Sequence, residues 1–542
     1  MTRMTGGQAL AKSIIAHGVD TIFGLPGVQL DWFFNALHDE GNNIRVLNSR
    51  HEQGVAYMAL GYAQSTGRVG AYAVVPGPGV LNTTAALSTA YAANVPVLCV
   101  TGQIPEAHIG RGYGLLHEIP DQLGTLRGLT KWAARIDHGI DAPDKVAEAF
   151  KQLRTGRPRP VALEMALDVL AQKSEIALPQ PVDGHARPAL DDDAIAAAAK
   201  LLGEAENPLI FVGSGVFGAE AALKELAEML QAPVVQNRTG RGALDARHPL
   251  SVTMLAGHKL WAKADVVLAV GTRLQVPRMN WGTDDDLKII HVELDGAEMK
   301  RVATPTIGLA ADARDALPAL VDAVTRTNRQ RAPRDAEMAA IDAEITGLLE
   351  DKLAPQMQYV KALRRGLDED GIYADELTQV GYVGRIGLPV YRPRSFLTSG
   401  YQGTLGSGYA VALGAQVANP DRQVLSINGD GGFMYNVQEI ATAVRYNLPV
   451  VAVVFADNAY GNVKRMQQQL YDGRVIASDL TNPDFVALAE SFGAAGYRAD
   501  TPERLNEAMA DAFRQRGPAV IEVPMGEMPD PWRWLIPGRI RG

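Results

Sequence analysis

The clearest chemical signal lies in two aspartates that follow apolar segments in the last third of the chain. The segment Gln423–Ile427 runs into the glycine-rich stretch Gly429–Gly432, which contains Asp430, and the apolar run Val450–Phe455 is followed by Asp457. Glycines after a strand let backbone N–H groups approach a phosphate, and the N-terminus of the next helix adds a favourable field. Asp430 would repel that phosphate unless a cation lay between them, so the pattern indicates a metal–diphosphate site.

The spacing of the two aspartates favours one shared ion. Asp457 follows Asp430 by 27 residues, which is room for one helix and one strand that return the chain to the same sheet edge. A GDG triplet alone would favour a simple helix cap at Asp430 and a turn at Asp457, whereas the pair at this spacing favours a metal site. Carboxylate and main-chain oxygens suit Mg²⁺. We therefore expect Asp430, Asp457 and the main-chain carbonyl of Ala459 to hold the ion.

The elements that must position these residues follow an α/β pattern. Short apolar strands alternate with helical patterns along the chain, which predicts doubly wound parallel sheets with helices on both faces. We expect three such domains, at residues 1–176, 190–326 and 357–542, joined by a Pro- and Asp-rich linker at Ala177–Asp191 and a polar helical connection at Thr327–Met357. The expected strands are Thr21–Gly24, Arg45–Asn48, Gly70–Val75, Val97–Thr101, Pro160–Met165, Pro208–Val212, Val234–Gln236, Val266–Val270, Lys288–Glu293, Gln423–Ile427, Val450–Phe455 and Ala519–Val523.

Composition narrows the class of protein. With 542 residues, 47% hydrophobic and 21% charged, the chain has the profile of a multidomain globular protein. The net charge of −9 and the lack of a basic stripe argue against nucleic-acid binding. The single cysteine, Cys99, excludes an internal disulfide and a cysteine metal cluster, and its apolar surroundings favour a buried position over a nucleophile. We find no signal core and no run of about 18 apolar residues, so we expect a cytoplasmic protein without a membrane anchor.

Several segments together resemble the thiamine diphosphate-dependent enzymes, in particular the group of acetolactate synthases, pyruvate oxidases and 2-oxo acid decarboxylases. The resemblance rests on the strand–GDG motif with its distant Asp457 and on the segments Arg50–Tyr62, Val75–Asn82 and Leu397–Gly406, which occur in the family's order along nearly the whole chain. It implies an N-terminal pyrimidine-binding domain, a central domain and a C-terminal diphosphate-binding domain, with thiamine diphosphate and Mg²⁺ as cofactors.

The resemblance also implies roles for individual residues. Glu52 matches the glutamate that hydrogen-bonds the pyrimidine ring and promotes loss of the C2 proton of the cofactor. Asn82 matches a residue near the reaction centre. Gly403 and Leu405 match the turn that accepts the pyrimidine amine and bends the cofactor, and Gln379 aligns with a diphosphate contact. The other residues assigned to cofactor binding are Pro26, Gly429, Asp430, Gly431, Gly432, Asp457, Ala459, Tyr460, Gly461 and Asn462.

The central domain carries a motif that suggests a dinucleotide. The segment Pro208–Gly218 contains GxGxxG directly after a strand, but the next strand leads to Val234–Arg238 without the acidic residue that would hold a ribose. This disfavours NAD. Arg273 resembles the start of a flavin-contacting segment of acetolactate synthases, but the charged continuation is replaced by Leu-Gln-Val-Pro, so the motif is incomplete and FAD is disfavoured as a further cofactor.

Substrate-side residues are fewer. His117 and Glu118 stand where acetolactate synthases carry an aromatic residue and a glutamine. We expect His117 to donate a proton to a carboxylate or alkoxide as a catalytic residue beside Glu52 and Asn82; a surface-loop histidine is the alternative. Val28 would narrow the space near the reaction centre. Trp532 and Trp534 would either cover the site or dock the C-terminal tail, and we favour docking.

The function expected from the resemblance is cleavage of a C–C bond next to a carbonyl group, with loss of CO₂ from a 2-oxo acid and transfer of the remaining acyl unit, as in acetolactate synthase. The alternatives are a simple 2-oxo acid decarboxylase, a C–C lyase or hydrolase of the same superfamily, and a relative that binds the cofactor without catalysis. Because relatives clamp the cofactor between the first domain of one subunit and the third domain of another, the resemblance implies a homodimer or homotetramer with active sites at the subunit interface.

Overall fold

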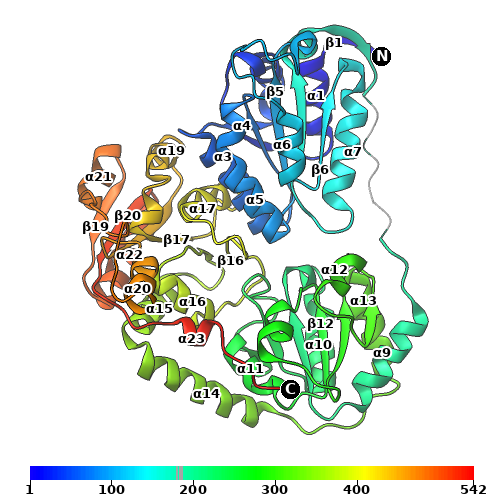
Figure 1. The fold of residues 1–542 in the computed structure, drawn as a ribbon, viewed down its shortest axis with the longest axis vertical. Helices are drawn as coiled ribbons and strands as arrows, with labels where there is room; N and C mark the ends of the chain where they lie inside the picture. The colour runs from blue at the N-terminus through cyan, green and yellow to red at the C-terminus, as the bar shows by residue number, and fades with distance from the viewer. Residues whose placement is uncertain (179–180, 182–186) are drawn as a thin grey trace.

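The computed structural model describes residues 1–178, 181 and 187–542, so most of the predicted linker at Ala177–Asp191 lies outside the described residues. Figure 1 shows three α/β units, each with a sheet between helices. Each unit has a six-stranded sheet in which all paired strands run parallel, and this confirms the predicted fold class. A small antiparallel pair, β1 (Thr2–Thr5) with β8 (Lys173–Ile176), brings the two ends of the first unit together.

The strand order of the sheets defines where ligands can bind. In the first sheet the order is β3 (Arg45–Leu47), β2 (Thr21–Gly24), β4 (Gly70–Val74), β5 (Val97–Gln103), β7 (Val161–Ala166) and β6 (Trp132–Ile136). The central sheet is β11 (Ser251–Val252), β10 (Val234–Gln236), β9 (Pro208–Val212), β12 (Val266–Val270), β13 (Lys288–Val292) and β14 (Ile307–Leu309). The third sheet is β16 (Phe396–Leu397), β15 (Ile372–Ala374), β17 (Val424–Gly429), β18 (Val450–Ala456), β20 (Ala519–Pro524) and β19 (Ala495–Arg498).

The chain reverses its direction of winding between β2 and β4, between β9 and β12, and between β15 and β17. Crevices at the carboxyl ends of strands that flank such a reversal are where open parallel sheets bind ligands. β17 and β18 are buried almost throughout, as expected for strands covered on both faces.

Helices cover these sheets. The first unit contains α1 (Gly6–Ala16), α2 (Asp31–Asp39), α3 (Glu52–Thr66), α4 (Pro78–Asn82), α5 (Thr84–Ala93), α6 (Gln122–Leu129), α7 (Ala142–Arg154) and α8 (Leu167–Ala171). The central unit contains α9 (Asp192–Glu204), α10 (Glu220–Leu230), α11 (Met254–Trp261), α12 (Gly296–Arg301) and α13 (Ala313–Val324). The long α14 (Asp335–Lys352) connects it to the third unit, which contains α15 (Ala354–Gly366), α16 (Gln379–Gly387), α17 (Ser407–Ala418), α18 (Asp430–Phe433), α19 (Ile440–Arg445), α20 (Gly461–Leu470), α21 (Phe485–Phe492), α22 (Pro502–Gln515) and α23 (Trp532–Leu535).

The first and third units are joined through α3 and α17, which pack against each other with their backbones close together. A Cβ atom on Gly61 would lie 1.9 Å from the carbonyl oxygen of Val411, and one on Gly414 would lie 1.9 Å from that of Met58. Only glycine therefore fits at these two crossing points. The same contact holds the N-terminus of α3, where Glu52 lies, beside the third unit.

Two further expectations concern the chain as a whole. Cys99 lies on β5 and is fully buried, and burial raises the pKa of its thiol to about 12, which suits a core residue and not a nucleophile. Among the helices that the structure describes, none combines the length and the apolar character needed to cross a bilayer.

Candidate functional site

Asp430 and Asp457 lie at the carboxyl ends of neighbouring parallel strands. Asp430 directly follows β17 as the first residue of α18, and Asp457 directly follows β18. The two strands are in register, with Gly429 opposite Phe455. Both carboxyl groups therefore lie on the same edge of the third sheet, beside the reversal between β15 and β17. The structure thus brings together the two acids that the spacing predicted to meet.

The carboxyl group of Asp430 is almost fully buried and held by three N–H donors. Its Oδ1 accepts a hydrogen bond from the main-chain N–H of Gly431 at 2.8 Å, and its Oδ2 accepts one from the N–H of Asn458 at 2.7 Å. The side chain of Asn482 donates to the same Oδ2 at 2.7 Å. These donors fix the direction of the carboxyl group before any ligand binds.

The electrostatics of the pair fit a cation. Burial raises the pKa of Asp430, and burial followed by the charge of Asp430 raises the pKa of Asp457 to about 6. Neighbouring carboxylates of this kind, one buried and one half-buried, are stabilised when a divalent cation lies between them. Among the described residues no group of three or more His, Cys, Asp and Glu side chains gathers to hold a metal.

Close contacts explain the glycines around the two aspartates. A Cβ on Gly461 would lie 2.3 Å from Oδ2 of Asp457, and one on Gly431 would lie 2.7 Å from the ring of Tyr460. A Cβ on Gly432 would lie 1.9 Å from Oε1 of Glu376, a residue that sequence analysis did not single out. The sequence argument assigned Gly432 to phosphate approach; the structure shows that it also makes room for a buried acid.

In the first unit, Glu52 and Asn82 are brought together. Glu52 is the first residue of α3 and Asn82 is the last residue of α4, and the amide of Asn82 donates a 3.0 Å hydrogen bond to Oε2 of Glu52. The N-terminus of α3 is anchored on the third unit, because the buried carboxyl group of Glu439 accepts the main-chain N–H of Arg50 and of His51, each at 3.1 Å from its nearer oxygen. Glu52 is thereby placed by a residue far away in sequence.

His117 lies in a loop that approaches the β2–β4 reversal, where Pro26 also lies. Its φ of +67° is unusual for a side-chain-bearing residue. The ring Nδ1 is 2.8 Å from Oε1 of the buried Gln29, and the amide of Gln29 donates to the carbonyl of Leu116 at 2.9 Å. Val28, by contrast, has 60% of its surface exposed in this single chain. Gln29 thus fixes both the loop and the ring, and sequence analysis missed it.

The turn before α17 is held from three sides. Gly403 and Gly406 have φ of +61° and +78°, which only glycine adopts easily, and Leu405 lies between them. Thr404 shares a 2.7 Å hydrogen bond with Thr89 of α5, so the turn also contacts the first unit. Glu376 accepts the N–H of Gly406, and Asn436 donates to the carbonyl of Gly406.

Two other predicted cofactor residues have protein partners of their own. Oε1 of the buried Gln379 accepts a 2.8 Å hydrogen bond from Arg465 of α20. The carbonyl oxygen of the Asn462 side chain accepts the indole N–H of Trp532, whose ring lies 5.1 Å from that of Tyr382. The C-terminal segment, red in Figure 1, then crosses to the central unit. There the guanidinium group of Arg541 donates a hydrogen bond to the carboxyl group of Asp284.

The structure does not bring all predicted residues into one cluster. Within the parts of the chain that it describes, no hydrogen bond or ion pair joins Glu52, Asn82 or His117 to Asp430 or Asp457. The chain presents two half-sites, one on the first unit and one on the third.

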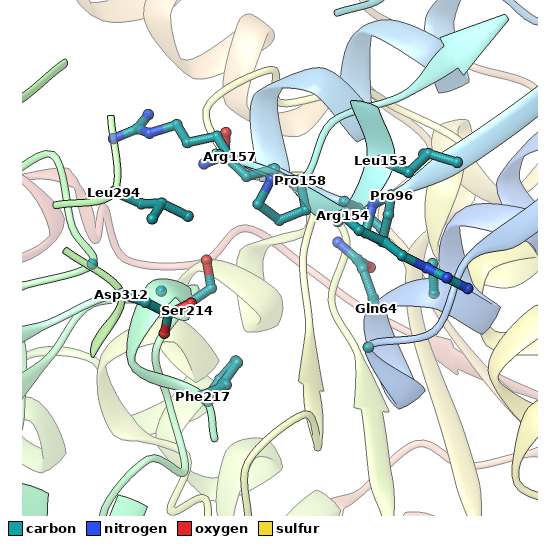
Figure 2. A pocket seen from close by; sticks show the side chains of 18 of the residues that line it. Gln64, Pro96, Leu153, Arg154, Arg157, Pro158, Ser214, Phe217, Leu294 and Asp312 are labelled. Atoms are coloured by element: carbon teal, nitrogen blue, oxygen red, sulfur yellow. The ribbon is translucent and has the colours of Figure 1, made fainter. Parts of the chain in front are cut away.

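A separate cavity of about 700 Å³ lies between the first and central units, with residues of the third unit contributing. Figure 2 shows Arg154 and Arg157 of the first unit on one side and Ser214, Phe217 and Asp312 of the central unit on the other. Arg157 is engaged in ion pairs with Glu293 at 2.6 Å and Glu298 at 2.8 Å.

The GxGxxG turn beside this cavity is already satisfied by the protein. The N–H groups of Gly213 and Gly215 donate to the carbonyls of Val270 and Gly271, and the N–H of Gly218 donates to the carboxyl group of Glu220 at 3.0 Å. A carboxylate thus occupies the position at the start of α10 where a dinucleotide phosphate would bind. Arg273 is likewise engaged, with Glu298 at 3.1 Å.

Comparisons with known proteins agree across the chain. Residues 4–125, 195–320 and 379–523 match, in turn, the N-terminal TPP binding domain, the central domain and the C-terminal TPP binding domain of thiamine pyrophosphate enzymes. A probable 2-ketoarginine decarboxylase of Pseudomonas aeruginosa is 33% identical over 96% of this chain and 94% of its own. A probable acetolactate synthase large subunit of Methanocaldococcus jannaschii is 34% identical over 96% and 92%, and the acetolactate synthase isozyme 1 large subunit of Escherichia coli is 31% identical over 96% and 94%.

Proposed function

Because the chain belongs to the thiamine pyrophosphate enzyme family, we propose that it is a thiamine diphosphate- and Mg²⁺-dependent enzyme that removes CO₂ from a 2-oxo acid and joins the remaining acyl unit to a carbonyl acceptor, as an acetolactate synthase does. The observation that carries the proposal is the pair formed by the buried Asp430 and the half-buried Asp457 on adjacent strand ends. When bound, the cofactor supplies a carbon nucleophile for the substrate carbonyl and accepts the electron pair left by C–C cleavage.

In this proposal the third unit holds the diphosphate end of the cofactor. Asp430 and Asp457, with the main-chain carbonyl of Ala459, hold Mg²⁺, since all three offer the oxygen ligands that this ion prefers. Gln379 and the start of α20 lie beside the pair and receive the phosphates. The turn at Gly403–Gly406 supports the rings, with Leu405 beneath them.

The first unit supplies the proton chemistry. Glu52 holds a proton at the pyrimidine nitrogen, and the hydrogen bond from Asn82 keeps its carboxyl group oriented. His117 acts on the substrate side: its Nδ1 donates to Oε1 of Gln29, so its Nε2 accepts a hydrogen bond in the neutral ring and donates to a carboxylate or alkoxide only in the imidazolium form. Since the two half-sites are separate within one chain, we propose a homodimer or homotetramer in which each active site joins the halves of two subunits.

Decarboxylation without carboligation is the second candidate. It is favoured by the 33% identity to the probable 2-ketoarginine decarboxylase, which the comparison covers almost end to end. A C–C lyase or hydrolase and a non-catalytic cofactor-binding relative remain the further alternatives. FAD stays disfavoured, because the amides of the glycine-rich turn and Arg273 are already engaged.

The purified protein tests this proposal when it is incubated with thiamine diphosphate, Mg²⁺ and pyruvate or longer 2-oxo acids, with CO₂ and carboligation products measured together. Release of CO₂ with acetolactate supports the carboligase, and release of CO₂ with only the aldehyde supports the decarboxylase. The Asp430→Asn variant should lose binding of Mg²⁺ and of thiamine diphosphate together, as measured by calorimetry. The matched variant Asp351→Asn, which alters an exposed acid paired with Lys352 at the end of α14, should keep both. Tight binding retained by Asp430→Asn would contradict the metal site.

A further inference from the structure

Glu376 is a buried acid that none of the predicted roles uses. It lies two residues after the end of β15, on the strand-end edge that also carries Asp430, and it is 1% exposed. Its two carboxyl oxygens have different surroundings. Oε1 accepts a 2.5 Å hydrogen bond from the main-chain N–H of Gly406, whereas Oε2 has no hydrogen-bond partner among the described residues.

The residue that Glu376 contacts belongs to the turn that shapes the cofactor site. Gly406 is the N-cap of α17 and has no side chain with which to cap the helix itself. Its N–H is taken by Glu376, and its carbonyl accepts a 2.5 Å hydrogen bond from the side chain of Asn436. The peptide groups on both sides of Gly406 are therefore clamped by residues that are distant in sequence.

The neighbouring glycines make room for this carboxyl group. A Cβ on Gly432 would lie 1.9 Å from Oε1, and a Cβ on Gly408 would lie 2.9 Å from Oε2. One of these glycines belongs to the GDGG motif and the other to the first turn of α17. Both helices thus lack side chains at the places where Glu376 enters.

The surroundings of Glu376 favour the uncharged acid. The structure gives it no Lys, Arg or His partner among the described residues, and a buried carboxylate without a cation is costly. Burial, with a smaller contribution from the charge of Asp375, raises its pKa to about 8, although the N–H groups of Gly406 and Gly408 act in the opposite direction. Asp375, by contrast, is paired with Arg385 at 2.8 Å. The other titratable groups close enough to interact with Glu376 are three tyrosines, whose pKa values its charge would raise: Tyr57, Tyr382 and Tyr435.

We propose that Glu376 is a positioning residue: as an uncharged carboxylic acid it caps α17 and fixes the Gly403–Gly406 turn in the shape that receives the cofactor. The identity of the ligand rests on the proposed function, whereas the hydrogen bonds with Glu376 and Asn436 that hold Gly406 do not depend on it. Glu376 does not touch the reacting atoms; it acts through Leu405 and Gly403, whose positions depend on the peptide that it holds.

Two substitutions separate a neutral clamp from the alternatives. Glu376→Gln keeps the size and the Oε1 acceptor but is always uncharged, whereas Glu376→Leu keeps the bulk and removes the acceptor. Asn436→Ala removes the other half of the clamp. Two measurements apply to each protein: hydrogen–deuterium exchange of the peptide around residues 403–410 without cofactor, and calorimetric binding of thiamine diphosphate with Mg²⁺. Thermal melts and circular dichroism check that each variant is folded.

We expect Glu376→Gln to match the wild type in exchange and in cofactor affinity. Glu376→Leu and Asn436→Ala should exchange faster at the turn, and Glu376→Leu should bind cofactor about tenfold more weakly, the loss expected when a buried N–H is left without its acceptor. Wild-type exchange and affinity in Glu376→Gln, but not in Glu376→Leu, would show that an uncharged hydrogen-bond acceptor at position 376 is sufficient.

The contrary outcomes are distinct. If folded Glu376→Leu has wild-type exchange and affinity, the positioning role is overturned. If Glu376→Gln is as impaired as Glu376→Leu, the uncharged form is overturned and a charged carboxylate is required. If the wild type binds no thiamine diphosphate, the proposed function and the cofactor part of this inference both fall, while the exchange data still decide whether Glu376 holds the turn.

Discussion

At the scale of single residues, the candidate chemistry depends on acids whose surroundings give them different tasks. Asp430 is buried and Asp457 beside it is half-buried; burial raises the pKa of both carboxyl groups, and the charge of Asp430 raises that of Asp457 further. Glu52 instead has an amide donor, Asn82, at 3.0 Å and lies at the start of a helix, where a carboxylate is stabilised. These environments suit a metal ligand pair in one half-site and a proton-holding carboxyl group in the other.

Glu52→Gln should abolish proton exchange at C2 of bound thiamine diphosphate while leaving cofactor affinity nearly unchanged. The amide preserves the shape and the contact with Asn82 but cannot hold the proton at the pyrimidine nitrogen. Quenched-flow exchange in deuterium oxide measures the first effect and calorimetry the second. Asn82→Ala serves as the companion variant, with slowed rather than abolished exchange. Wild-type exchange in the Glu52→Gln protein would remove Glu52 from its proposed role.

The stability of the cofactor-free protein should depend on Glu376. Its folded pKa of about 8 lies above the value near 4.5 of the unfolded chain, so the folded state keeps the proton longer. The stabilisation is therefore complete below about pH 4.5 and is lost as the pH rises towards 8, by at most about 1.4 kcal/mol per pH unit. Denaturant unfolding of wild type and Glu376→Gln across this range should show the wild type losing stability relative to the variant. Parallel curves would mean that Glu376 is ionised in the folded protein.

At the scale of elements, the half-sites are placed by contacts between units. α3 carries Glu52 and crosses α17, whose N-terminal turn contains Leu405, and Gly61 and Gly414 allow the two helices to approach. Glu439, in the 3₁₀ turn before α19, holds the start of α3. The orientation of each half-site therefore depends on a helix crossing whose contact residues, Gly61 and Gly414, have no part in the proposed chemistry.

Gly414→Ala should destabilise the protein by roughly 1–3 kcal/mol or more, because the new methyl group would meet the main-chain oxygen of Met58 and force the helices apart. Gly347→Ala is the matched control: it lies in the exposed interior of α14, where a Cβ meets nothing within 4 Å, and it should stabilise the helix by about 1 kcal/mol. Denaturant unfolding measures both. Equal effects of the two substitutions would contradict the close crossing of α3 and α17.

At the scale of the whole molecule, the three units differ in the proposed functional residues that they carry. The first and third units carry the residues proposed for chemistry. The central unit lies between them along the chain, and the C-terminal segment runs from the third unit back to the central unit (Figure 1). In the proposed function each active site joins the first unit of one subunit to the third unit of another, so Glu52 and Asp430 of one chain would serve different sites. An active site shared between two subunits can be tested with any 2-oxo acid that gives measurable turnover, even if it is not the natural substrate.

Mixing two inactive variants should restore activity if each site uses two subunits. In a mixed dimer of Glu52→Gln and Asp430→Asn chains, one site carries both substitutions and the other carries neither. Random reassociation after mild dissociation should recover about a quarter of wild-type activity, because about half of the dimers are mixed and each has one intact site. Each variant reassociated with itself is the control. No recovery, despite mixed dimers detected by native mass spectrometry, would place Glu52 and Asp430 of one chain in the same site.

Much of this architecture follows from local sequence. Thr21–Gly24, Pro208–Val212, Val234–Gln236 and Val266–Val270 are strands with the predicted bounds, because buried parallel strands are continuous apolar runs between turn residues. The meeting of Asp430 and Asp457 was likewise predictable, since the ends of consecutive parallel strands reach one sheet edge. β15 and β16, with three and two residues, were not predicted, although β10, which also has three residues, was.

What the sequence determined by itself was the class of the fold, the edge where the two aspartates gather and the family whose cofactor they suit, since each depends on patterns within a few dozen residues. Only the tertiary structure decided that Glu376 enters between Gly406 and Gly432, that Gln29 orients His117, and that Glu439 holds the start of α3. Those facts join residues tens to hundreds of positions apart, and they depend on strand order and helix crossing, which no local pattern encodes.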